Sequence, residues 1–364
     1  MFTARGYSYS QKRRRRHRAA IRAKRRRPPG AALLMALAVF GLCGAAFTIV
    51  ASMSSATSTE AAAPTPVAEA LMALATVAPP TSTTVPLRPT APPTLVPTLV
   101  PTLAPRPAGL LPEHRILSFY GNPLAKEMGI LGELPSEQML ARLKQQMAAY
   151  AVTDASRPFV PALELVTPAA QGWAGEDGLY RARMKPEVIE QVANWAEAND
   201  ALLILDVQIG LSTVPEEVEA LIPYLRRPYV HLALDPEFAI PSGHIPGEVV
   251  GTLDASTIDG VVRTLSELVA SEHLPPKILV VHRFTDSMVT NAWEIAHSDP
   301  NVQIVVTMDG FGPPALKLAQ YRSYVHDQGV QYSGIKLFYH HDVPLLTPKD
   351  VLGLDPSPDL VIYQ

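Results

Sequence analysis

One alternation of segments constrains the fold of this chain more than any other feature of its sequence. From about residue 115 to residue 364, short apolar runs of strand length alternate with stretches whose apolar residues recur at helical spacing. A helix is expected at Val289–Ala296, with Trp293 on its core side. Eight runs are expected as strands: Ile116–Tyr120, Phe159–Val166, Ala201–Ile209, Val230–Phe238, Lys277–Phe284, Val302–Met308, Gly334–Tyr339 and Leu360–Tyr363.

Eight strands that alternate with helices predict an α/β fold, a (β/α)8 TIM barrel, over residues 113–364. The runs are almost continuously apolar, as expected of parallel strands that are buried on both faces. An open, doubly wound sheet is the competing architecture, but its first strand usually leads into a glycine-rich phosphate-binding turn. Here that turn reads Gly121-Asn122-Pro123, which favours the barrel.

The first part of the chain has a different composition. Residues 1–30 hold 12 Lys or Arg and no acid, although the whole chain has a net charge of −3. Residues 31–53 contain no charged side chain and are long enough to cross a bilayer as a transmembrane helix. Because Lys and Arg beside a span stay in the cytoplasm, we expect residues 1–30 to be a cytoplasmic tail and the barrel to be extracytoplasmic. The tail is interpreted as a topology signal, and no nucleic-acid partner is expected.

The segment between the expected span and the barrel, residues 54–112, is rich in Pro, Thr and Ala. Proline at this density removes backbone donors and favours an extended chain, so a disordered linker is predicted. A cleaved signal peptide is the alternative to a membrane anchor, but the apolar run is longer than a typical signal-peptide core. Cys43 could carry a lipid anchor and, as the only cysteine, it excludes an intrachain disulfide.

Every predicted strand ends in a hydrogen-bonding or ionisable side chain. Active sites of (β/α)8 barrels lie at the carboxyl ends of the strands. Strand ends often meet water and are polar for that reason alone, but several of these groups continue the inward face of their strands. The candidates for substrate binding are Tyr120, Asn122, Glu164, Trp173, Asp206, Gln208, His282, Asp309, Lys336, Tyr339 and His340.

The fourth predicted strand ends in two carboxyl groups, Asp235 and Glu237. Positions two apart on a strand share a face, so both should point the same way as His231 and Ala233. Neighbouring carboxylates repel each other, and such a cost is usually tolerated where chemistry or binding needs it. The alternative is that Asp235 caps the following loop and that Glu237 is solvated.

The sequence Asp235-Pro236-Glu237 resembles the Asp-x-Glu motif on strand four of barrel glycoside hydrolases, with family 25 lysozymes and family 18 chitinases as the nearest patterns. The resemblance implies that Glu237 is the catalytic general acid and that Asp235 assists it. It covers three residues. Ala233 and Val230 stand where family 18 has further Asp residues, and Tyr120-Gly121-Asn122 stands where family 25 has an Asp.

We therefore expect a membrane-anchored, extracytoplasmic glycoside-hydrolase-like protein that acts on peptidoglycan or another extracellular polysaccharide, without a cofactor or a metal. A catalytically inactive barrel that binds or senses glycan is one alternative. A metal-dependent hydrolase is another, although no H-x-H on strand one and no H-E-x-x-H occurs. Side chains of the types that bind divalent ions are Glu164, Asp206, Glu237, His282, Asp309 and His340.

Overall fold

The computed structural model describes residues 109–364 of the chain. The predicted cytoplasmic tail, the predicted span and nearly all of the predicted linker lie outside these residues. Among the helices of residues 109–364, none has the length and hydropathy needed to cross a membrane.

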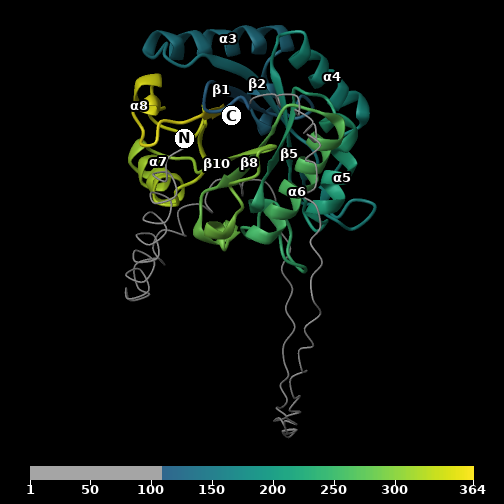
Figure 1. Cartoon of the computed structure of the whole chain (residues 1–364). Helices are drawn as coiled ribbons and strands as arrows, with labels where there is room; N and C mark the ends of the chain where they lie inside the picture. The colour runs from purple at the N-terminus through teal and green to yellow at the C-terminus, as the bar shows by residue number, and fades with distance from the viewer. Residues whose placement is uncertain (1–108) are drawn as a thin grey trace, which may run out of the picture. The chain divides into compact units, whose positions relative to one another are not determined.

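Eight parallel strands close into a barrel in the order β1-β12-β11-β10-β8-β6-β5-β2 (Figure 1). The ring closes where β1 pairs with β12, with Ile116 opposite Leu360. The predicted barrel is therefore confirmed. Its strands are β1 (Arg115–Gly121), β2 (Phe159–Val166), β5 (Leu202–Val207), β6 (Val230–Leu234), β8 (Lys277–Arg283), β10 (Val302–Met308), β11 (Tyr332–Leu337) and β12 (Leu360–Tyr363).

Helices surround the strands and cover their outward faces (Figure 1). Several begin with a proline, whose missing N–H is not needed in the first turn. Thr347 and Asp350 form a reciprocal capping box at the start of the last helix. The helices are α2 (Ile130–Glu133), α3 (Ser136–Thr153), α4 (Pro186–Glu197), α5 (Val214–Leu225), α6 (Ala255–Glu272), α7 (Pro314–Tyr321) and α8 (Pro348–Leu352), with a π-helical turn, η6 (Arg322–His326), after α7.

Short elements occupy several connections between the barrel strands. Two small sheets pair β3 (Ala169–Ala170) with β4 (Arg181–Ala182), and β7 (Leu253–Asp254) with β9 (Val289–Thr290). Four 3-10 turns complete the connections: η2 (Lys126–Met128), η3 (Pro236–Phe238), η4 (Asp286–Met288) and η5 (Ala292–Glu294).

The helix predicted at Val289–Ala296 is wrong. The segment begins as β9, turns at Asn291 in the left-handed conformation and continues as η5. The Asn291 amide donates to the Asp254 carboxylate over 2.7 Å, and this bond holds the turn. Trp293 is consequently 58% exposed instead of packing in the core.

The barrel interior changes character along its axis. Near the amino ends of the strands it is filled by apolar side chains, and Leu111 closes that end through a bond from its amide to the Gln303 side chain (3.1 Å). Towards the carboxyl ends, the inward positions become polar. The apolar layer includes Leu111, Ile116, Ala162, Ile204, Ala233, Ile278, Val280, Val305, Leu360 and Ile362.

Candidate active site

The polar layer brings together eight of the residues expected at the site. All are buried, and they come from the ends of seven different strands. The alternation of side chains along each strand turns them inward, above the apolar layer. They are Tyr120, Glu164, Asp206, Gln208, Asp235, His282, Asp309 and Lys336.

Asp309 lies between the two cationic side chains of this layer. Lys336 Nζ is 3.2 Å from Asp309 Oδ1, and His282 Nδ1 is 3.2 Å from Asp309 Oδ2. Lys336 Nζ also stands 3.4 Å from the centre of the Tyr120 ring. Although burial favours the neutral acid, Lys336 and His282 hold the pKa of Asp309 below its usual value. Asp309 is therefore a buried carboxylate held in its charged form.

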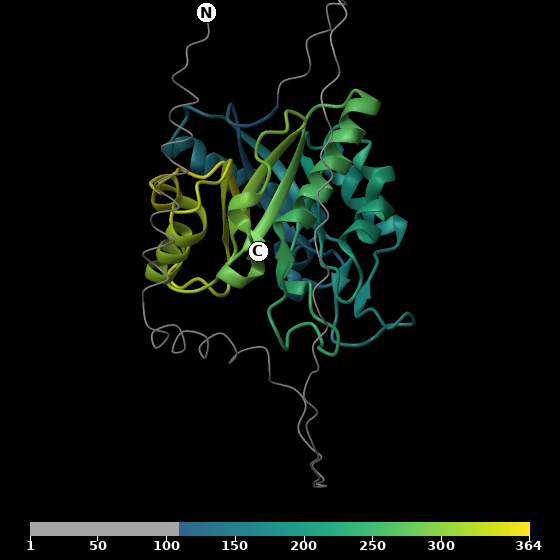
Figure 2. The same ribbon diagram turned by 60° about the horizontal axis from the view of Figure 1, so that its bottom comes forward.

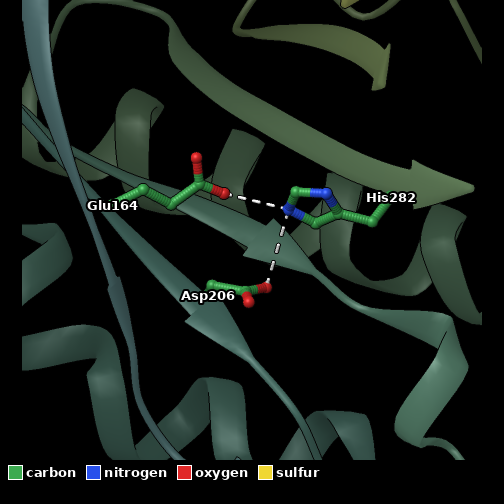
Figure 3. A group of neighbouring side chains, drawn as sticks. All are labelled: Glu164, Asp206 and His282. Atoms are coloured by element: carbon green, nitrogen blue, oxygen red, sulfur yellow. Dashed lines mark hydrogen bonds and ion pairs between the residues drawn. The ribbon is translucent and has the colours of Figure 1, made fainter. Parts of the chain in front are cut away.

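The other nitrogen of His282 faces two more carboxyl groups (Figure 3). His282 Nε2 is 2.9 Å from Glu164 Oε1 and 3.9 Å from Asp206 Oδ1. Burial opposes a charged imidazole, but Asp309 and Glu164 raise the pKa of His282 well above its ordinary value. Carboxylates thus bracket this histidine on both sides.

A second chain of hydrogen bonds links Asp206 to Asp235. The Tyr120 hydroxyl donates to Asp206 Oδ2 over 2.8 Å. Gln208 Nε2 lies 3.2 Å from the Tyr120 hydroxyl and 3.2 Å from Asp235 Oδ2, so it donates to both. Burial is the main cause that raises the pKa of Asp206 to about 6 and that of Asp235 to about 7. At neutral pH the carboxyl group of Asp206 is therefore mostly ionised, and that of Asp235 is about half protonated.

Glu237 lies beside the polar layer and differs from its members because it is half-buried and therefore reachable from solvent. Strand β6 ends at Leu234, and Pro236 opens the turn η3, so the expectation that Asp235 and Glu237 share a strand face is wrong. Instead, the Glu237 amide donates to Asp235 Oδ1 over 3.3 Å. Burial, followed by the charges of Asp235 and Asp309, raises the pKa of Glu237 to about 8. At neutral pH its carboxyl group is mostly protonated.

Two long loops frame this end of the barrel. Figure 2 shows the loops that follow β2 and β6 extending beyond the same end. The second loop returns to the site through the Gly251 amide, which donates to the Glu237 carbonyl oxygen over 2.6 Å. Trp173, in the first loop, is 67% exposed and does not contact the polar layer through any ring stacking or hydrogen bond among the described residues.

Three predicted site residues lie elsewhere. Asn122 is buried and shapes the turn after β1, where its amide donates to the Val166 carbonyl oxygen over 3.1 Å. Tyr339 stacks on Tyr363, outside the barrel wall, with 5.0 Å between the ring centres. His340 is exposed and pairs with Glu133. Each of these residues follows its strand's last inward position, where strand parity no longer determines direction.

The sequence interpretation missed an aromatic group beside the site. Phe311 follows Asp309 by two residues, is 42% exposed, and packs edge-on against Phe338 at 5.8 Å between ring centres. His341 adjoins both rings. The position of Phe311 just after a site carboxylate was the available signal.

It also missed a buried lysine beneath the site. Lys317, on α7, donates from Nζ to the carbonyl oxygens of Gly310 and Lys336, each over 2.7 Å. Its charge is balanced by Asp342 at 2.9 Å. Lys317 thereby connects the end of β11 to the loop that carries Asp309. Its position within a helical pattern in the sequence did not indicate that it would contact this loop.

Comparisons with known proteins give no family. No protein-family model matches the chain, and no curated protein matches it. Among solved structures, it is similar to a GH5 xyloglucan-specific endo-β-1,4-glucanase from a metagenomic library, with 12% identity, a TM-score of 0.33, and coverage of 67% of this chain and 82% of that one. It is also similar to a hyperthermophilic endo-β-1,4-glucanase, with 10% identity, a TM-score of 0.31, and coverage of 70% and 89%. The specific resemblance to family 25 and family 18 enzymes stays a prediction.

Proposed function

We propose that this chain is a glycoside hydrolase in which Glu237 is the general acid. The observation that carries the proposal is that Glu237 is the half-buried carboxyl group at the mouth of a buried polar layer, kept mostly protonated at neutral pH. Hydrolysis of a glycosidic bond needs an acid of this kind to protonate the leaving oxygen.

The reaction also needs a second carboxylate that stays ionised, and Asp309 is suited to this role. Its two oxygens are each 3.2 Å from a cationic group, Lys336 Nζ or His282 Nδ1. In the proposed mechanism Asp309 stabilises the positive charge that develops on the sugar, or positions the attacking water. Asp235 assists by accepting the hydrogen bond from the Glu237 amide, which orients the turn that carries the acid.

Exposed aromatic rings beside the site favour a sugar as the substrate. Phe311 and Trp173 are 42% and 67% exposed, and both follow the carboxyl ends of barrel strands. The C–H faces of pyranose rings are apolar and stack on aromatic side chains, whose burial contributes favourably to binding. We assign Phe311 as the nearer platform, because it lies two residues from Asp309.

The proposed location is extracytoplasmic, with a membrane anchor at residues 31–53. The basic run in residues 1–30 and the uncharged run after it support this orientation. The Pro/Thr-rich residues 54–112 would then act as a spacer. A tether of this kind favours peptidoglycan or another surface polysaccharide as the substrate.

The full chain, purified in detergent, allows a direct test. Release of reducing ends from peptidoglycan and a panel of polysaccharides would be measured for the wild type, Glu237→Gln and Glu267→Gln. Glu267 is exposed on α6 and serves as the matched control. We expect Glu237→Gln to lose about 10²- to 10⁴-fold in turnover, as for removal of a general acid, and Glu267→Gln to retain it. Equal release by Glu237→Gln, or no release from any glycan, would contradict the proposal.

A further inference from the structure

The polar layer carries more acidic than basic groups. Within residues 109–364, the eight residues of the layer and the adjacent Glu237 together provide five carboxyl groups and two cationic side chains. Burial of unbalanced charge is costly unless protons or a bound cation neutralise it. The carboxyl groups are Glu164, Asp206, Asp235, Glu237 and Asp309, and the cations are His282 and Lys336.

Three of these side chains converge on one point. Glu164, Asp206 and His282 each offer a ligand atom, and these atoms all lie within 4.8 Å of one another (Figure 3). The distance from His282 Nε2 is 2.9 Å to Glu164 Oε1 and 3.9 Å to Asp206 Oδ1. Nitrogen and oxygen ligands at ~2.1 Å from one ion stand roughly 3.0 to 3.4 Å apart. The pair at 3.9 Å would have to close by roughly 0.5 Å, and ligand atoms as far apart as 4.8 Å by roughly 1.4 Å, which rotation of the carboxylate side chains can supply.

One oxygen of each of the two carboxyl groups has no hydrogen-bond partner within the described part of the chain. These oxygens are Glu164 Oε2 and Asp206 Oδ1, and both residues are 0% exposed. A buried carboxylate oxygen without a donor is destabilising. A cation at the convergence point would contact Asp206 Oδ1, and it would also contact Glu164 Oε2 if Glu164 bound through both oxygens.

Neighbouring side chains hold two of the three converging residues in place. Asp309 lies 3.2 Å from His282 Nδ1, which leaves Nε2 to point at the carboxylates. This matches the common arrangement in which a carboxylate orients a metal-bound histidine. The Tyr120 hydroxyl donates a hydrogen bond to Asp206 Oδ2 over 2.8 Å, which leaves Asp206 Oδ1 to face the convergence point.

We propose that Glu164, Asp206 and His282 bind one divalent first-row metal ion at the centre of the barrel mouth. A set of one imidazole and two carboxylates suits Zn²⁺ or Mn²⁺ better than Ca²⁺, which prefers oxygen ligands alone. The inference stands apart from the proposed hydrolysis, because the ion would balance the buried charge whether or not the barrel cleaves glycan. Since the ligands are fully buried, the ion enters as the chain folds.

Metal content of the full chain tests this site without reference to activity. The chain would be expressed with Zn²⁺ and Mn²⁺ supplied, purified without chelators, and measured by mass spectrometry of the elements. We expect about one equivalent in the wild type and at least a tenfold loss in Glu164→Gln and Asp206→Asn. Asp235→Asn, a change in the same layer that spares the three ligands, should retain the ion.

The experiment must distinguish metal bound at the buried site from metal bound at a surface site. His326 is exposed and lies 2.9 Å from Asp327 and 3.3 Å from Asp355, so these groups could also collect an ion. His326→Gln should retain about one equivalent of metal per chain. Loss of metal from this variant would overturn the proposal.

Histidine ¹⁵N spectroscopy covers the case in which the ligand variants fail to fold. In the wild type refolded with Zn²⁺, we expect the His282 Nε2 resonance to be that of a metal-bound, unprotonated nitrogen. A folded, metal-free wild type with protons on both nitrogens of His282 would overturn the proposal, because protons would then provide the charge balance.

Discussion

The two halves of the barrel interior are built from the same strands but have opposite roles. In the half near the amino ends, side chains such as Ile204 and Ile278 are fully buried and apolar, and their burial stabilises the fold. In the half near the carboxyl ends, Asp206 and His282 are just as buried, and their desolvation costs stability unless partners offset it. The difference shows that the apolar side chains and the buried polar side chains of the interior are separated along the barrel axis.

The separation follows from strand geometry. Ile204 and Asp206 are two residues apart on β5, and Val280 and His282 are two apart on β8. Because side chains alternate, each pair shares the inward face, one residue in the apolar layer and one in the polar layer. The apolar layer supplies the rigid base on which the polar groups are held.

Breaking the apolar half should have the largest effect on stability. Ile278→Ala removes a fully buried side chain from the interior and leaves a cavity. We expect the free energy of unfolding to fall by about 2–5 kcal/mol, measured by urea denaturation. Val152→Ala, at an 89% exposed position, is the control and should stay within roughly 0.5 kcal/mol of the wild type. A loss below about 1 kcal/mol for Ile278→Ala would contradict the stabilising role of this layer.

The polar half should impose an alkaline limit on activity. The pKa of Glu237 is raised to about 8, so above that pH the proposed acid loses its proton. We expect kcat/KM to fall about tenfold per pH unit, roughly hundredfold by pH 10, in a pH–rate profile. The residual rate of Glu237→Gln should lack this limb. If kcat/KM of the variant still falls at high pH, a group other than Glu237 causes the fall.

Removal of one carboxyl group from the polar half should improve stability at high pH. Burial raises the pKa of Asp235 from 3.8 to about 7, so its destabilising effect is absent below pH 4, grows as pH rises and is complete above pH 7. Relative to the wild type, Asp235→Asn should gain on the order of 4 kcal/mol of unfolding free energy between pH 4 and pH 8. Urea denaturation at both pH values measures this. An equal difference at the two pH values would show that Asp235 does not titrate as proposed.

The smallest effect is expected at the rim of the polar half. Phe311→Ala removes the proposed sugar platform and should raise KM about fivefold, with kcat nearly unchanged, because stacking contributes roughly 1 kcal/mol. Trp293→Ala is the control, because it removes another exposed ring from η5, which lies against α6 in the outer layer. Steady-state kinetics on the same glycan would compare them. Similar changes in both variants would argue against a specific platform.

Sequence reasoning recovered the polar layer well because its residues continue regular strands. Glu164, Asp206 and His282 lie in phase with apolar inward residues, so their direction could be predicted from parity alone. The same reasoning failed beyond strand ends. Tyr339 lies after the last residue of β11 and packs outside the barrel, and Glu237 is carried by a turn that Pro236 begins.

The sequence by itself determined the alternation of strands and helices, and with it the barrel and the inward face of each strand, because these depend on local periodicity. Tertiary structure alone decided which polar groups meet. Glu164 and His282 are 118 residues apart and come within 2.9 Å only because the barrel closes. Closure also places Asp309 and Glu164 against His282, whose pKa these carboxylates raise despite its burial, and creates the point where three ligand atoms converge.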